Sequence, residues 1–240
     1  MNVELIPIPG VPEIRPGDDL GPILTDATRK AGIALRDGDV IVVTQKVVSK
    51  AEGRVVSEEP DGKAAWVARE TRRVVARRDD LVIAETRHGF VCANAGVDAS
   101  NVGGGMLALL PEDPDASAER LRATFAELAG VGVAVVITDT FGRAWRRGLV
   151  NVAIGAAGLP SLVDLRGTTD ASGRTLEVTV VALADEIAAA TGLVMGKAEG
   201  VPAAVVRGVR SEGPLLPASA IVRPPEEDLF RIGEGGERAT

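Results

Sequence analysis

Two short apolar runs constrain the fold of this chain most strongly. Val40–Thr44 reads VIVVT, and Val133–Thr138 reads VAVVIT. Both indicate core strands, and the second, which is apolar throughout, is typical of a strand buried on both faces of a sheet. Helical patterns lie between such strands, so the sequence predicts an α/β fold.

The other elements follow from periodicity and from turn residues. Helices are expected at Asp19–Ala31, Lys63–Arg78, Asp115–Leu128 and Val178–Ala190. Further strands are expected at Val3–Pro7, Leu81–Glu85, Phe90–Ala93 and Ala203–Val206, with Leu81–Glu85 and Phe90–Ala93 forming a hairpin. The 240 residues are expected to form one domain, 1–240, with room for two subdomains, and 224–240 is interpreted as a peripheral tail.

Composition excludes several classes of protein. Aromatic residues make up 2 % of the chain and the net charge is −7, which argues against a nucleic-acid partner. The N-terminus lacks a signal-peptide pattern and every long apolar stretch is interrupted, so we expect a cytoplasmic protein without a membrane span. Cys92 is the single cysteine, and its apolar surroundings indicate a buried, inert thiol.

Two acidic residues are candidate metal ligands. Asp98 lies in the small, polar stretch NAGVDASNVGGG, and Asp139 follows the strand Val133–Thr138. Carboxylates, supplemented by Thr140, Asn101 or water, are hard oxygen ligands that suit Mg²⁺ or Mn²⁺. The alternative is that each aspartate only caps a turn.

Basic residues follow Asp139 closely. Arg143, Arg146 and Arg147 surround Trp145, and Lys50 follows a buried strand. Arginine forks and lysine point charges beside a carboxylate–metal centre would suit triphosphate chemistry. The alternative for the arginine cluster is a solvated basic face.

Four stretches together resemble the coenzyme F-420 γ-glutamyl ligase family. They are DGDVIVVTQKVVSKAEGR, FVCANAGVDASNV, ITDTFGRAWRRGLVNVAIGAAGL and ADEIAAATGLVMGK. The similarity runs from Val3 to about Arg210. Four long motifs in the same order make a specific signal.

The resemblance implies an activity and an assembly. Members add L-glutamate to the glutamate-free form of the deazaflavin coenzyme F-420, and GTP is consumed to GDP and phosphate through an acyl phosphate. Mg²⁺ or Mn²⁺ is required, and K⁺ helps some members. The implied fold is a family-specific mixed sheet with flanking helices, in an intertwined homodimer.

The resemblance also implies roles for individual residues, each at a position that matches a family motif. The metal ligands would be Asp98 and Asp139, with Thr140 reaching a second ion. The nucleotide contacts would be Pro9, Gly10, Val11, Pro12, Gln45, Lys46, Lys50, Asn101, Met195, Gly196 and Lys197. The residues expected to carry the chemistry are Asp98, Asp139, Lys50 and Arg143.

One departure and two rival functions complete the prediction. Lys197 stands where some members carry an acid, so the expectation of a second metal there is weakened, although Glu199 could substitute. The rivals are a metal-dependent phosphohydrolase and a domain of a larger protein that only binds nucleotide or F-420. Some relatives continue into a nitroreductase-like domain, and PPEEDLFRIG resembles the joint before it.

Overall fold

A five-stranded mixed sheet forms the centre of the protein. The computed structural model describes residues 2–100, 102–196, 199–210 and 212–230. The strand order is β1 (Glu4–Pro7), β12 (Ala203–Arg207), β2 (Val40–Thr44), β8 (Ala134–Arg143) and β9 (Arg146–Ala157). Only β2 and β8 run parallel among these neighbours, and the other pairs are antiparallel. The predicted α/β class is confirmed.

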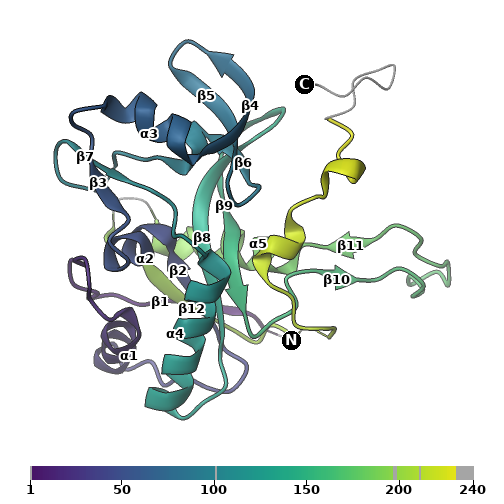
Figure 1. Cartoon of the computed structure of the whole chain (residues 1–240). Coiled ribbons are helices and arrows are strands. Elements are labelled where there is room, and N and C mark those ends of the chain that lie inside the picture. Colours follow the sequence, from purple (N-terminus) through teal and green to yellow (C-terminus); the bar gives the residue numbers. More distant parts are fainter. Residues whose placement is uncertain (1, 101, 197–198, 211, 231–240) are drawn as a thin grey trace.

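Helices cover both faces of this sheet (Figure 1). On one face, α1 (Leu20–Lys30) and α4 (Pro114–Ala129) pack Leu24 and Phe125 against Ile41 and Ile137. On the other face, α5 (Leu183–Met195) packs Ala184 and Ile187 against the alternate residues of β2 and β8. The strands are therefore buried on both sides, as their uninterrupted apolar sequence predicts.

A smaller unit with its own core lies above one end of the sheet in Figure 1. Its elements are β3 (Val55–Ser57), α3 (Gly62–Glu70), β4 (Thr71–Arg78), β5 (Leu81–Thr86), β6 (Val91–Ala93), η1 (Asn94–Gly96) and β7 (Met106–Ala108). Helix α2 (Gln45–Ala51) leads into it from β2 and packs Val48 in the core of the main sheet. The pairing of β5 with β6 confirms the predicted hairpin. The third core cluster includes Val67, Val82, Ala84 and Leu107.

The expected helix Lys63–Arg78 is wrong in its second half. Helix α3 ends at Glu70, and β4 follows at once and pairs antiparallel with β5. The β-branched residues Thr71, Val74 and Val75 favour a strand locally. The hydrogen bonds offered by β5 then outweigh the helical spacing of the apolar residues.

Two other expected boundaries also shift. Val133–Thr138 continues as β8 to Arg143, because β9 folds back beside it and extends the ladder. The expected helix Val178–Ala190 begins only at Leu183 as α5, and Val180–Val181 instead form the short strand β11. The β-branched first half of that segment is therefore extended.

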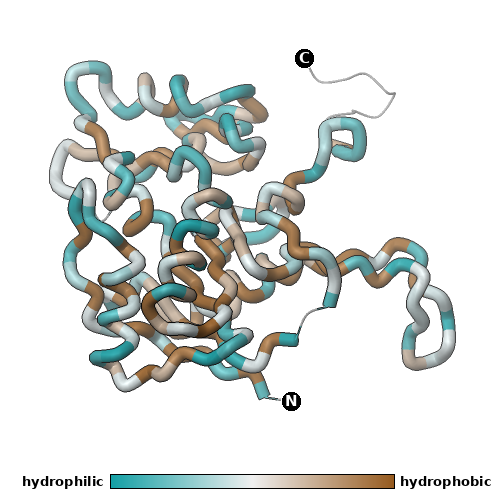
Figure 2. The backbone as a smooth tube through the Cα atoms, turned by 60° about the horizontal axis from the view of Figure 1, so that its bottom comes forward, coloured by the Kyte–Doolittle hydropathy of each residue, from teal (hydrophilic) through white to brown (hydrophobic). Residues whose placement is uncertain are grey.

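A thin arm projects from the body between β9 and α5 (Figure 1). It contains β10 (Val163–Asp164) paired with β11. Figure 2 shows hydrophobic residues along its two limbs and a more hydrophilic tip. The chain then returns through β12 to the short helical turns η2 (Ala218–Ile221) and η3 (Pro225–Glu227). Within the described residues, no helix combines the length and the apolar character that crossing a membrane requires.

Candidate functional site

The pairing of the parallel strands β2 and β8 ends at their carboxyl ends, and this end of the sheet is called the carboxyl edge below. The last paired residues are Thr44 and Thr138. Gln45 and Lys46 follow Thr44 directly as the start of α2, and Asp139 follows Thr138. The carboxyl end of parallel strands is a favoured ligand position in α/β proteins. Lys46 leaves the sheet at this position, and Asp139 lies there on β8, which continues beside β9.

The segment after β6 brings Asp98 to this edge. Asn94, Ala95 and Gly96 all adopt positive φ, which turns the chain sharply. A Cβ on Gly96 would lie 2.7 Å from Leu110 Cγ, so glycine is needed for this close approach. Asp98 is then fixed by backbone hydrogen bonds with Ala108 in both directions, of 3.0 and 2.7 Å.

Lys46 and Asp98 form an ion pair across the site. Lys46 Nζ lies 2.8 Å from Asp98 Oδ2, and it also donates to Ser100 Oγ. Ser100 in turn donates to Asp98 through its backbone N–H at 2.9 Å and its hydroxyl at 2.7 Å. Burial raises the pKa of the Asp98 carboxyl, but the hydrogen bonds from Lys46 and Ser100 outweigh burial and lower the pKa overall. The carboxylate is therefore ionised at neutral pH and held in place.

Asp139 lies close enough to Cys92 to act on its thiol. Burial raises the pKa of Cys92 to about 12, and the negative charge of Asp139 is the second cause. The thiol is therefore protonated at neutral pH and cannot serve as a nucleophile. The burial of Cys92 inferred from sequence is confirmed, and its lack of reactivity stays a prediction. The influence of Asp139 on Cys92 also puts Asp139 beside the strand that leads to Asp98.

Thr140 faces the other side of the sheet from Asp139, because side chains alternate along a strand. Its hydroxyl donates to Asn151 Oδ1 at 2.8 Å. Asn151 in turn approaches α5, since a Cβ on Gly192 would lie 3.3 Å from Asn151 Nδ2. Asp139 and Thr140 therefore do not converge on one ion through the same face. Asn151 and Ser100 are polar partners of the site residues that sequence patterns did not single out.

The N-terminal turn and Lys50 are brought together. Lys50 Nζ lies 2.6 Å from Glu13 Oε1, one residue after the Pro9–Pro12 turn, and Gly17 N donates to Ala51 O at 2.9 Å. Gly10 has a φ of 74°, which favours glycine. The expected nucleotide contacts Pro9, Gly10, Val11, Pro12 and Lys50 thus lie beside the end of α2.

Gln45 points inward rather than to the surface. Its side chain is buried, and Oε1 accepts a 2.8 Å hydrogen bond from Ser49 Oγ. Its Nε2 has no hydrogen-bond partner among the described residues. Contact between Gln45 and a nucleotide stays a prediction. It would require the nucleotide to approach the buried side chain from the carboxyl ends of β2 and β8.

The arginine cluster lies at the tip of the β8–β9 hairpin. Arg143 pairs in register with Arg146, and Arg143 Nη2 donates to Arg147 O at 3.3 Å. Arg143 is four residues beyond Asp139, which corresponds to roughly 13 Å along an extended strand. The catalytic role expected for Arg143 stays a prediction. From the tip of the hairpin, its side chain would reach the part of a ligand that lies farthest from Asp139.

The end of α5 is described only in part. Met195 is buried, and Gly196 ends the helix with a φ of 60°. Glu199 packs against Gly196 so closely that a Cβ there would clash with its carboxylate. Lys197 and Asn101, both expected at the nucleotide, lie outside the described residues.

The donors at this edge fit a divalent ion that binds mainly to substrate. The described residues contain no group of three His, Cys, Asp or Glu side chains arranged to hold a metal by themselves. Mg²⁺ usually binds through one or two carboxylates together with substrate phosphates and waters. The ionised Asp98, with Asp139 at the same edge, matches that mode of binding.

Comparison with known proteins places the chain in a family. The sequence model of the family described as F420-0:Gamma-glutamyl ligase matches residues 10–208. Among similar proteins, a coenzyme F420:L-glutamate ligase of Methanothermobacter thermautotrophicus is 44 % identical, over 96 % of this chain and 100 % of its own. Proteins of the same name from Methanopyrus kandleri and Archaeoglobus fulgidus are 46 % and 43 % identical to it. Each of these two alignments covers 96 % of this chain, and they cover 98 % and 97 % of the length of those proteins. The chain therefore belongs to the F420-0:gamma-glutamyl ligase family.

Proposed function

We propose that this protein is a GTP-dependent ligase that joins L-glutamate to the glutamate-free form of coenzyme F-420. Family membership supports the ligation of glutamate. The observation that carries the nucleotide part is the Lys46–Asp98 ion pair at the edge where β2 and β8 separate beside Asp139. A cation and two carboxylates at such an edge suit a metal-bound triphosphate.

The proposed reaction needs no protein nucleophile. The carboxylate of the acceptor attacks the γ-phosphorus of GTP, so GDP leaves and an acyl phosphate forms. The amine of glutamate then attacks the acyl carbon, phosphate leaves, and the amine proton passes to solvent. The same two steps on the new glutamate would form a γ-glutamyl bond. This route agrees with a Cys92 thiol that is protonated and buried.

The chain's residues would act by positioning and by charge stabilisation. Asp98 and Asp139 would hold Mg²⁺ or Mn²⁺, which neutralises charge on the phosphate oxygens when bound. Lys46 and Lys50 would each exchange their present carboxylate partner for a phosphate oxygen. Thr140 is proposed for a further ion, for which K⁺ is a candidate, on its own face of the sheet. Arg143 would neutralise an anionic group of the substrates that lies farther from Asp139.

A homodimer is part of the proposal. The arm carrying β10 and β11 projects from the body (Figure 1), and Val178 and Val180 on it are exposed. A two-stranded ribbon is marginally stable alone in water. A second copy of the chain is the expected partner for the arm, and the molar mass in solution from light scattering tests this.

The decisive experiment is mass spectrometry of glutamate-free F-420 incubated with the protein, GTP, Mn²⁺ and L-glutamate. We expect products heavier by one or more glutamyl residues, together with stoichiometric GDP. Omitting glutamate should abolish steady GDP release. GDP release that continues without glutamate would instead favour a phosphohydrolase. Saturable binding of GTP without any turnover would favour a domain that only binds its ligands.

A further inference from the structure

The few aromatic residues of the chain gather around one cavity. The whole sequence has two Trp, four Phe and no Tyr. Four of these six, Phe90, Phe141, Trp145 and Phe230, line a cavity of about 600 Å³ between β5, β6, the β8–β9 hairpin and the segment 218–230. Protein interiors are close-packed, so a space of this size stands out from ordinary packing. Its volume is of the order that small-molecule sites have.

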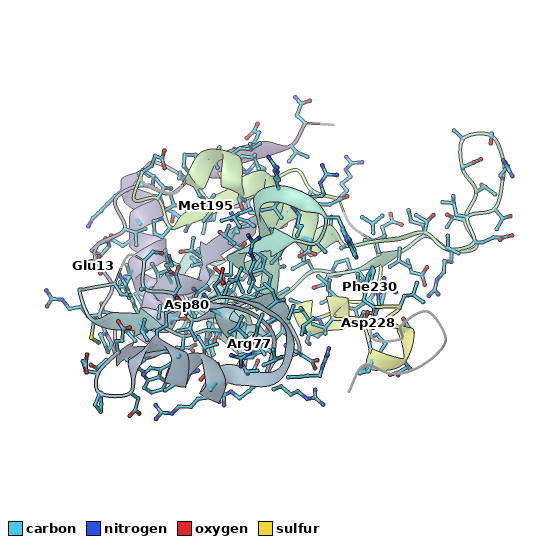
Figure 3. All side chains as sticks on the ribbon, turned by 90° about the horizontal axis from the view of Figure 1, so that it is seen from above. Glu13, Arg77, Asp80, Met195, Asp228 and Phe230 are labelled. Carbon is cyan, nitrogen blue, oxygen red and sulfur yellow. The ribbon has the colours of Figure 1, made fainter. Side chains whose placement is uncertain are left out.

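The four rings form two walls. Phe90 and Phe141 meet edge to face, with centroids 6.3 Å apart. Trp145 and Phe230 meet at 4.9 Å with their planes tilted by 46°. Figure 3 shows Phe230 and Asp228 together on the C-terminal segment. Trp145 is 81 % exposed and Phe230 75 % exposed, so these large apolar rings are presented to solvent rather than used in the core.

The cavity adjoins the proposed phosphate site. Phe141 lies two residues after Asp139 on β8, so the two side chains share a face of the strand. Val152, the cross-strand partner of Asp139, also lines the cavity. Val91 also lines the cavity, and it precedes Cys92, whose pKa is raised by the nearby charge of Asp139 in addition to burial. A group bound in the cavity would therefore have one end near Asp139.

One cation on the lining is available to an anionic group. Arg223 is exposed and makes no ion pair with another described residue, whereas Arg73 is paired with Glu85 at 3.1 Å. Two carboxylates are also present, and each accepts a backbone hydrogen bond. Asp185 accepts from Ala153 N at 2.8 Å, and Asp228 accepts from Phe230 N at 3.0 Å.

We propose that this cavity holds the fused aromatic ring system of the acceptor, between the wall of Phe90 and Phe141 and the pair Trp145 and Phe230. Arg223 meets its anionic substituents, and the reactive carboxylate points toward Asp139. This inference rests on the proposed function, because it takes the acceptor to be a deazaflavin. Stacking on aromatic side chains recognises a planar ring without requiring a particular pattern of hydrogen bonds.

The test is calorimetric titration of the full chain with glutamate-free F-420, in the absence of nucleotide. We expect Trp145→Ala to raise the Kd for the acceptor about tenfold, as the loss of one stacking contact predicts. Trp145→Phe, which keeps a ring, should remain within about threefold of the wild type. Trp66→Ala is the matched control, because Trp66 lies on α3 and does not line the cavity. The Kd for GTP with Mn²⁺ should stay the same in all four proteins.

Three outcomes would overturn the inference. If the wild type makes the glutamylated product while Trp145→Ala and Phe230→Ala bind the acceptor as well as it does, the cavity assignment fails and the proposed function stands. If the wild type neither binds the acceptor nor turns over, both fail. If Trp145→Ala loses affinity only together with a change in the molar mass from light scattering, the cavity is an interface between copies of the chain instead.

Discussion

Lys46 Nζ lies 2.8 Å from Asp98 Oδ2, and this ion pair joins the start of α2 to the turn after β6. The pair has two consequences for a phosphate site. The carboxylate is kept ionised, and the ammonium group is held beside it without being deeply buried. Both groups are therefore charged before a ligand arrives. In the proposed site each exchanges the other for a new partner, the metal ion for Asp98 and a phosphate oxygen for Lys46.

Removing either carboxylate should cost most of the activity. We expect Asp98→Ala and Asp139→Ala each to lower kcat/KM by about 10²–10⁴, the loss typical for a charge-stabilising group. Steady-state release of GDP in the presence of glutamate measures this. The matched control is Asp26→Ala, since Asp26 pairs with Lys30 at 2.7 Å on the exposed face of α1. Near-normal turnover in both site variants would refute the metal assignment.

The same ion pair makes stability depend on pH. The folded-state pKa of Asp98 is lowered, since hydrogen bonds from Lys46 and Ser100 outweigh the opposing effect of burial. A lowered pKa means that the contribution to stability is present above the unfolded-state pKa of about 3.9 and is lost as pH falls through the folded-state value. Urea unfolding should therefore show Asp98→Asn less stable than the wild type at pH 7. The difference should shrink below pH 4, and a difference that is constant down to pH 3 would contradict this account.

Cys92 should be unreactive in the folded protein. Burial, with the charge of Asp139 as the second cause, raises the pKa of its thiol to about 12, and only 6 % of the residue is exposed. Because the thiolate is the reactive species, Ellman's reagent at pH 8 should detect no rapid thiol in the native state. One equivalent should appear after unfolding in guanidinium chloride. A full equivalent within seconds in the native protein would contradict both the burial and the assigned pKa.

Much of the fold was predictable because it depends on local pattern. The strand Val40–Thr44 and the hairpin before Asp98 match β2, β5 and β6 closely. The error at Lys63–Arg78 arose because β4 is held by β5, and pairing with a distant strand leaves no local signal. The same limit applies to the site, where sequence marked Asp98 and Asp139. The contact of Lys46 with Asp98 and the grouping of aromatic rings depend on the tertiary fold.

Arg207 should be far more important for stability than an arginine in an exposed pair. Arg207 binds Asp39 through Nε at 2.9 Å and Nη2 at 2.7 Å, and the Asp39 side chain is 2 % exposed. Arg207→Ala would leave that buried carboxylate without its charged partner and with the hydrogen bond from Arg36 N at 2.9 Å, which costs about 3–5 kcal/mol. The control Arg166→Ala removes a similar forked contact to Asp164, but on the surface, where solvent screens the pair and only a small loss is expected. Urea unfolding of the two variants measures the contrast, and equal losses would show that burial of Asp39 does not govern the effect.

Gly155 should tolerate no side chain, because it is where α4 meets the sheet. A Cβ on Gly155 would lie 2.3 Å from Pro114 O. This is a backbone atom, so no change of rotamer can relieve the clash. The start of α4 is also fixed to the sheet by Asp115 Oδ1, which accepts from Ala156 N and Ala218 N at 2.8 Å each. Gly155→Ala should therefore force α4 away from β9 and destabilise the fold by about 1–3 kcal/mol, as overpacked sites do. Gly132→Ala is the control, since its Cβ would meet only Asp37 Oδ1 at 3.5 Å, and a change within about 0.5 kcal/mol is expected. Thermal unfolding separates the two, and a Gly155→Ala variant as stable as Gly132→Ala would mean that α4 can shift from β9 without loss.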